Sequence, residues 1–97
     1  MKFTFAGGKL KDLYETEKGK EKHPPEVVTA FFELTGRIRN STSLNTLRNH
    51  KGARLEKLTG RRNEYSMRLN RQFRLIVEFE EHEGETWVII LKIEDYH

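Results

Sequence analysis

The feature that most constrains the fold is a pair of alternating apolar patterns within residues 64–79. Apolar side chains take every second position on both sides of a short polar loop, which indicates two strands with one buried face. A two-residue loop would put the two apolar rows on opposite faces, whereas a three-residue loop at residues 70–72 puts them on the same face. We therefore predict that Leu69 pairs with Phe73, Met67 with Leu75, and Tyr65 with Val77.

The same register places Arg68 directly opposite Arg74 on the other face of the hairpin, next to Ser66 opposite Ile76. Like charges in such a pair destabilise a sheet by about 0.2–1 kcal/mol. One interpretation is that both arginines extend into solvent; the other, which we favour, is an anion site. Arginine suits phosphate because its planar fork donates two parallel hydrogen bonds. Further basic residues lie nearby in the sequence: Arg54, Lys57, Arg61, Arg62 and Arg71.

The N-terminal part of the chain predicts one strand and two helices. Residues 2–5 have the pattern of a short strand with Phe3 and Phe5 on one face, and Leu10, Leu13 and Tyr14 follow at helical spacing. A second helix is expected to begin at Pro25, since proline is favoured in the first turn. Its apolar stripe indicates a core contact rather than a ligand site and consists of Val27, Phe31, Leu34 and Ile38. The stretch NSTS ends this helix and can cap a short turn that carries Leu44 and Leu47.

The C-terminal part predicts strands at residues 54–58, on both sides of the loop at 70–72, and at 87–93, with a turn at 80–85. Residues 87–93 are apolar at nearly every position, which is typical of a central strand covered on both faces. The predicted order is β-α-α-β-β-β-β within a single domain of residues 1–97. This is an α+β fold in which an antiparallel sheet packs on two N-terminal helices.

Composition excludes several classes of protein. The chain has no cysteine, so disulfide and thiolate chemistry are excluded. No apolar run approaches the roughly 20 residues of a membrane helix, and the first residues do not resemble a signal peptide. The four histidines lack the spacing of metal ligands, so no metal is expected. A cytoplasmic protein without membrane contact is the expectation.

The charge is distributed unevenly along the chain. Residues 37–74 contain eleven Lys and Arg but two acids, a net charge of +9, whereas the rest has a net charge of −6. Such a block can be an ordinary solvated surface. It is also what a phosphate-rich partner such as RNA requires.

The sequence ends on KIEDYH, directly after the last predicted strand. Polar chain ends are common and often carry no function. Here, however, Asp95, Tyr96 and His97 are side chains that can move protons or bind phosphate, and they follow a core strand. These three side chains are therefore candidates for a functional site.

Two stretches resemble the HigB toxins of the RelE/ParE superfamily: RLEKLTGRRNEYSMRLNRQFRLIVEF, and the terminal IEDYH. The resemblance implies a RelE-like fold and a ribosome-dependent mRNA endonuclease that needs no metal or cofactor. It also implies a helix-turn-helix antitoxin, similar to HigA, as the partner that silences the toxin. DNA would be contacted only through that antitoxin.

The resemblance also implies roles for individual residues. Arg74 matches the arginine that holds the scissile phosphate, and Arg62 and Arg68 match RNA-contacting positions. The family's strand histidine is Glu56 here, and a lysine before the turn glycine is Thr59; YoeB-like members are similar in pairing a strand glutamate with a C-terminal histidine. The expected catalytic set is Glu56, Arg74, Asp95, Tyr96 and His97. The expected RNA-binding set is Arg54, Lys57, Arg61, Arg62, Arg68 and Arg71.

Other interpretations stay open at this point. Glu56 can serve simply to offset nearby arginines, and Asp95 can be an ion-pair partner. A ParE-like inhibitor of DNA gyrase would share the fold and need no acid–base residues. A plain RNA- or ribosome-binding module would use the basic face without chemistry.

Overall fold

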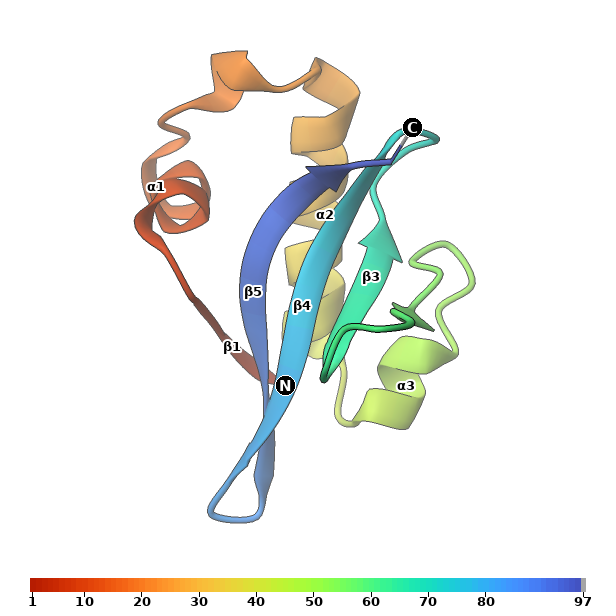
Figure 1. Cartoon of the computed structure of the whole chain (residues 1–97). Helices are drawn as coiled ribbons and strands as arrows, with labels where there is room; N and C mark the ends of the chain where they lie inside the picture. Colours follow the sequence, from red (N-terminus) through yellow and green to blue (C-terminus); the bar gives the residue numbers. More distant parts are fainter. Residues whose placement is uncertain (97) are drawn as a thin grey trace.

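The fold is built on a five-stranded sheet with the strand order β1-β5-β4-β3-β2. The computed structural model describes residues 1–96 of the chain. The strands are β1 (Lys2–Phe5), β2 (Glu56–Lys57), β3 (Glu64–Arg68), β4 (Phe73–His82) and β5 (Glu85–Asp95). The helices are α1 (Gly8–Thr16), the 3-10 turn η1 (Lys20–Lys22), α2 (Pro25–Asn40) and α3 (Leu44–Arg48). Figure 1 shows α2 behind the sheet, with the opposite face open to the viewer.

The predicted antiparallel meander is confirmed for β2 to β5. The sheet as a whole is mixed rather than antiparallel, because β1 pairs in parallel with β5, from Lys2 opposite Trp87 to Phe5 opposite Ile90. β5 is therefore a central strand, as expected. Its Val88 and Ile90 are fully buried, whereas Trp87 and Ile89 on the other face are partly exposed.

The predicted register of the β3–β4 hairpin is confirmed. Tyr65 pairs with Val77, Met67 with Leu75, and Arg68 with Arg74. The Leu69 amide donates to the Phe73 carbonyl at 3.1 Å, which leaves residues 70–72 as the loop. Met67, Leu75 and Val77 are completely buried, so this face of the hairpin belongs to the core.

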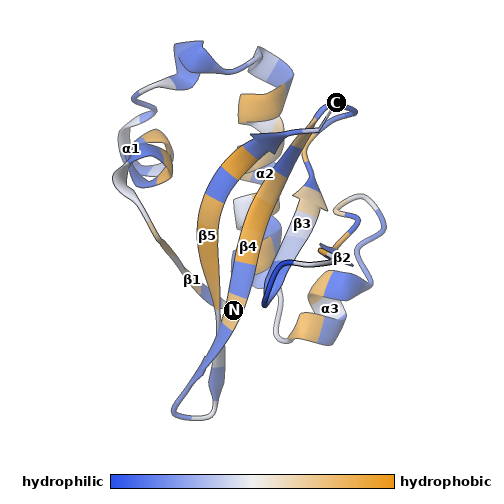
Figure 2. Ribbon diagram, in the orientation of Figure 1, coloured by the Kyte–Doolittle hydropathy of each residue, from blue (hydrophilic) through white to orange (hydrophobic). Residues whose placement is uncertain are grey.

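Helix α2 supplies the other side of that core. It begins at Pro25, and its stripe of Val27, Phe31, Leu34 and Ile38 is at most 3% exposed. The short helix α3 is capped by Ser43, whose hydroxyl accepts from the Thr46 amide, and it buries Leu47. Figure 2 shows the apolar residues running along β4 and β5 beside α2. Within residues 1–96, no helix combines the length and the apolar character that crossing a membrane requires.

Two predicted boundaries were wrong. The strand expected at residues 54–58 is only Glu56–Lys57, because Arg54 has a φ of 46°, in the left-handed region that an extended strand cannot use. The turn expected at residues 80–85 is only Glu83 and Gly84. Both have positive φ, as the tight turn of a two-residue hairpin requires, so β4 and β5 extend to its edges.

A β-bulge in β5 decides which side chains reach the helix-free face. Val77 pairs with Ile90 but the neighbouring Ile76 pairs with Lys92, so Leu91 is an extra residue. A bulge shifts the alternation of a strand by one position. Beyond it, Ile93 pairs with the buried Leu75, and Glu94 lies opposite Arg74 on the helix-free face.

The buried face predicts a large effect for one α2 side chain. Phe31→Ala should lower the free energy of unfolding by about 3–5 kcal/mol, because it removes a fully buried ring and leaves a cavity. Urea denaturation would measure this loss. The exposed Glu33→Ala on the same helix should change stability by no more than about 0.5 kcal/mol. Equal effects of the two substitutions would contradict this account of the core.

Candidate functional site

The helix-free face carries two rows of side chains that cross the sheet. Cross-strand pairing aligns Arg68 on β3, Arg74 on β4 and Glu94 on β5 in one row. The adjacent row consists of Glu56, Ser66, Ile76 and Lys92. Residues from all four C-terminal strands, distant in the sequence, therefore meet on one surface, and the predicted arginine pair lies within it.

Arg74 is held by backbone carbonyls and by an aromatic ring. Its Nη1 donates to the carbonyl of Asn70 at 2.7 Å and to that of Phe73 at 3.1 Å. Its guanidinium carbon lies 5.2 Å from the centre of the Tyr96 ring, a cation–π contact. Both hydrogen bonds that Arg74 makes within residues 1–96 use Nη1, so the side chain is oriented through one end of its fork.

The β3–β4 loop is bound to the end of β5. The Tyr96 amide donates to the Gln72 carbonyl at 2.6 Å, and Gln72 Nε2 donates to Asp95 Oδ2 at 3.1 Å. Within the loop, Asn70 Oδ1 accepts from the amides of Gln72 and Phe73 at 2.9 and 2.7 Å. Tyr96 thereby contacts Arg74, whereas Asp95 pairs with Phe73, in the row of residues that packs against the core. The prediction for His97 lies outside the described residues.

Arg61 lies across the sheet in a fork-like ion pair with Glu94. Its Nη1 donates to Oε1 at 3.1 Å, and its Nη2 lies 3.0 Å from Oε2. Lys92 Nζ lies 3.2 Å from Oε1 of the same carboxylate. The hydrogen bond from Arg61 holds the pKa of Glu94 below its usual value, and the same bond raises the pKa of Arg61. Glu94 therefore remains an anion at neutral pH and is a weak proton acceptor.

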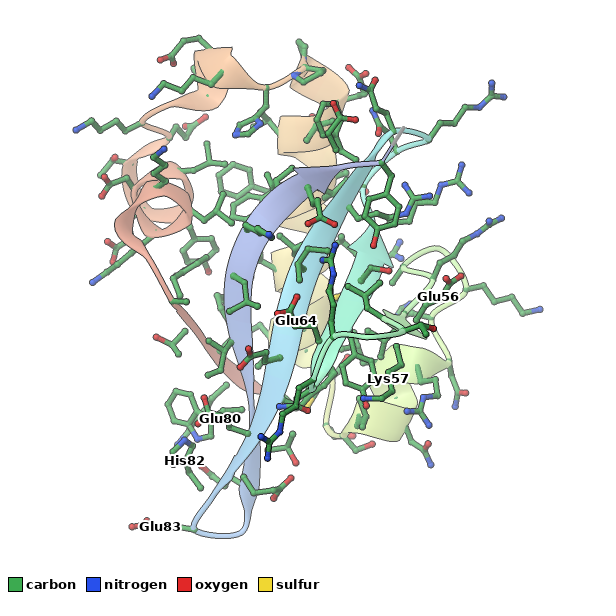
Figure 3. All side chains as sticks on the ribbon, viewed as in Figure 1. Glu56, Lys57, Glu64, Glu80, His82 and Glu83 are labelled. Carbon is green, nitrogen blue, oxygen red and sulfur yellow. The ribbon has the colours of Figure 1, made fainter. Side chains whose placement is uncertain are left out.

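Glu56 and Lys57 lie on β2, at the edge of the sheet (Figure 3). Both are exposed, and Lys57 Nζ lies 5.2 Å from the centre of the Tyr65 ring. Glu56 points to the same face as Ser66, one row away from Arg68 and Arg74. Beside it, residues 57–62 line an open cavity of 520 Å³. Arg61 and Arg62 contribute to the lining of this cavity.

Acidic residues lie at the far end of the long β4–β5 hairpin. Figure 3 shows Glu80, His82 and Glu83 near its tip, where His82 Nε2 lies 3.3 Å from a Glu80 carboxylate oxygen. Arg74 lies near the opposite end of the same strand, roughly 25 Å away for an extended chain. The face therefore has a basic end and an acidic end, which would orient a polyanion toward the basic one.

The structure brings together only some of the predicted catalytic and RNA-binding residues that it describes. Arg68 and Arg74 pair with each other, and Tyr96 contacts Arg74. Glu56 lies one row away, and Asp95 lies in the neighbouring row with Phe73, which packs against the core. Three further predicted residues are exposed in loops: Arg54, Arg62 and Arg71. Sequence reasoning missed Glu94 as a member of the site. Simple alternation from Val88 and Ile90 would point Glu94 into the core, so only the bulge reveals its position.

Comparison with known proteins gives a family match and a structural likeness. A family model described as the RelE-like toxin of the type II toxin-antitoxin system HigB matches residues 3–97. None of the curated proteins matches the chain. Among solved structures, a YoeB/ParE toxin from Agrobacterium tumefaciens is similar over 100% of both chains, with a TM-score of 0.62 and 12% sequence identity. At that identity, the structural likeness shows a shared fold alone.

The lowered pKa of Glu94 predicts a contribution to acid stability. The folded pKa lies below the usual 4.5, so the ionised carboxylate stabilises the fold above about pH 4.5 and this stabilisation is lost as the pH falls through the folded pKa. Glu94→Gln should therefore flatten the acid side of a plot of Tm against pH. Thermal denaturation from about pH 7 to about pH 3 would measure it, with Glu33→Gln as the exposed control. An acid limb as steep as in the wild type would contradict the ion pair.

Proposed function

This chain belongs to the RelE-like HigB family of toxins from type II toxin–antitoxin systems, and we propose that it cleaves mRNA on the translating ribosome. The observation that carries the proposal is the row of Arg68 and Arg74 with Tyr96 beside it. Two arginines opposite each other cost stability unless an anion lies between them. A phosphate of RNA is an anion that both guanidinium groups can bind.

The chemistry would use the nucleophile that RNA carries. The 2′-oxygen attacks the adjacent phosphorus, the bond from phosphorus to the 5′-oxygen breaks, and the product ends in a cyclic phosphate. Arg74, assisted by Arg68, would bind the phosphate and stabilise the charge that develops on it. Because Nη1 of Arg74 is engaged by two carbonyls, the guanidinium would meet the phosphate without first having to be oriented.

Two groups are proposed to move protons. Glu56 would take the proton from the 2′-hydroxyl, and His97 would give one to the departing 5′-oxygen, since imidazole titrates near neutral pH. Asp95 would orient or charge that imidazole, and Tyr96 would stack on a base or donate to the phosphate. Glu56 is exposed and one row from Arg74. Bound mRNA and the ribosome would therefore have to bring the 2′-hydroxyl to this carboxylate and partly desolvate it.

The remaining basic residues would bind the flanking RNA. These residues, Arg54, Lys57, Arg62 and Arg71, are exposed, and residues 57–62 line an open cavity at the β2 edge of the sheet. Such contacts position a nucleic acid without reading its sequence. In the cell we place this activity in the cytoplasm, under control of a helix-turn-helix antitoxin similar to HigA, with operator DNA contacted only through that antitoxin.

The test is to map 5′ ends of mRNA in cells that briefly express the wild-type chain, Arg74→Ala, or a chain lacking His97. We expect breaks in translated mRNA with the wild type, reduced about a hundredfold or more in both variants, because each removes a group that acts on the transition state. Arg39→Ala is the matched control, since this arginine is exposed on α2, on the other side of the sheet.

Other results would point elsewhere. Arrested growth with intact mRNA would favour inhibition of DNA gyrase, as in ParE-like proteins. Intact mRNA with normal growth would leave a binding module without chemistry. Cleavage by purified protein and ribosomes that stops only when the arginines are removed, and survives loss of His97, would contradict the assigned proton donor.

A further inference from the structure

Arg61 is expected from the sequence to contact RNA, but in the structure its guanidinium forms ion pairs with Glu64 and Glu94. It comes from the loop between β2 and β3, and it reaches Glu94 on β5, on the far side of β3 and β4. Its Nη1 also lies 3.6 Å from Glu64 on β3. The Asn63 side chain of the same loop donates to the Phe79 carbonyl on β4 at 2.8 Å. The loop is thus fastened across the helix-free face at several points.

The position of the Arg61 guanidinium follows from the register. Glu64 is two residues before Ser66 on β3, and Glu94 lies opposite Arg74, two residues before Ile76 on β4. A guanidinium in contact with both glutamates therefore lies over the Ser66–Ile76 pair. Those two residues are 3% and 0% exposed, although no helix covers this face. We infer that the Arg61 side chain helps to shield Ser66 and Ile76 from solvent.

Glu94 is the carboxylate best placed to pair with Arg74 and so to compete with a bound phosphate. The two residues are directly opposite each other on β4 and β5, at a spacing where opposite charges attract. Within residues 1–96, nevertheless, Glu94 forms ion pairs with Arg61 and Lys92 and none with Arg74. Arg61 holds both carboxylate oxygens, while Lys92 contacts one of them with a side chain that is 57% exposed. The fork of Arg61 is the stronger of the two restraints.

We propose that Arg61 is a positioning residue that holds the Glu94 carboxylate away from Arg74, so that Arg74 remains able to bind a phosphate of the substrate RNA. This inference rests on the proposed function. In it, Arg61 acts without touching RNA. On loss of Arg61, Glu94 is left with the weaker restraint of Lys92 and pairs with Arg74, which then competes with binding of the phosphate.

The experiment compares the wild type, Arg61→Ala, Glu94→Gln and the double variant, with Lys92→Ala as control. The first readout is the NMR signal of the Arg74 Nε–H group, which reports a new carboxylate partner whether or not the chain cuts RNA. We expect this signal to shift in Arg61→Ala and to return to the wild-type position in the double variant. Lys92→Ala should leave it unchanged. An unshifted signal in a folded Arg61→Ala would overturn the proposal.

The second readout is the rate of mRNA cleavage on purified, translating ribosomes. Arg61→Ala should slow cleavage about tenfold, and Glu94→Gln added to it should restore the rate to within about threefold of the wild type, as expected for coupled neighbours. If Arg61 instead bound a phosphate itself, the double variant would be as slow as Arg61→Ala. That result would also overturn the proposal.

Two controls keep the outcomes distinct. Should Arg61→Ala fail to fold, Arg61→Gln with and without Glu94→Gln gives the same comparison, because glutamine still covers Ile76. If the wild type cuts no mRNA, the proposed function fails, and the NMR signal of Arg74 alone then decides whether Arg61 keeps Glu94 from it.

Discussion

Burial of one face of the β3–β4 hairpin against α2 is the interaction on which the rest of the structure depends. Met67, Leu75 and Val77 have no exposed surface, and a slip of one residue would carry this whole row into solvent. The register is therefore fixed by the core. Its consequence on the opposite face is that Arg68 and Arg74 are forced together. The site thus inherits its geometry from hydrophobic burial on the far side of the same strands.

The bulge at Leu91 extends this logic to β5. It allows Ile90 and Ile93 both to face the core, and it turns Glu94 toward the arginines. In the proposed function, a carboxylate that neutralised Arg74 would prevent this arginine from binding phosphate. The fork of Arg61, which reaches across two strands, gives that carboxylate another partner. The bulge therefore places an acidic side chain beside Arg74, and the ion pair with Arg61 gives that side chain another partner.

In our proposal, the arginines of the basic segment, residues 37–74, have different roles. Arg61 is engaged by acids, Arg74 is oriented by carbonyls and the Tyr96 ring, and the other arginines surround them. The proposed base, Glu56, lies at the exposed edge of the sheet. In the proposed function, the ribosome would supply the orientation and desolvation that a deep cleft provides in other enzymes.

The sequence by itself determined the parts that depend on local periodicity. The stripe of α2, the alternation of β3 and β4, and hence the Arg68–Arg74 pair could all be predicted from spacing. The tertiary structure alone decided the parallel pairing of β1, the left-handed turn at Arg54, and the place of Glu94. The physical reason is that periodicity records which face of an element is buried, whereas a bulge, an edge pairing or an ion pair between residues 33 positions apart depends on contacts that form only when the whole sheet assembles.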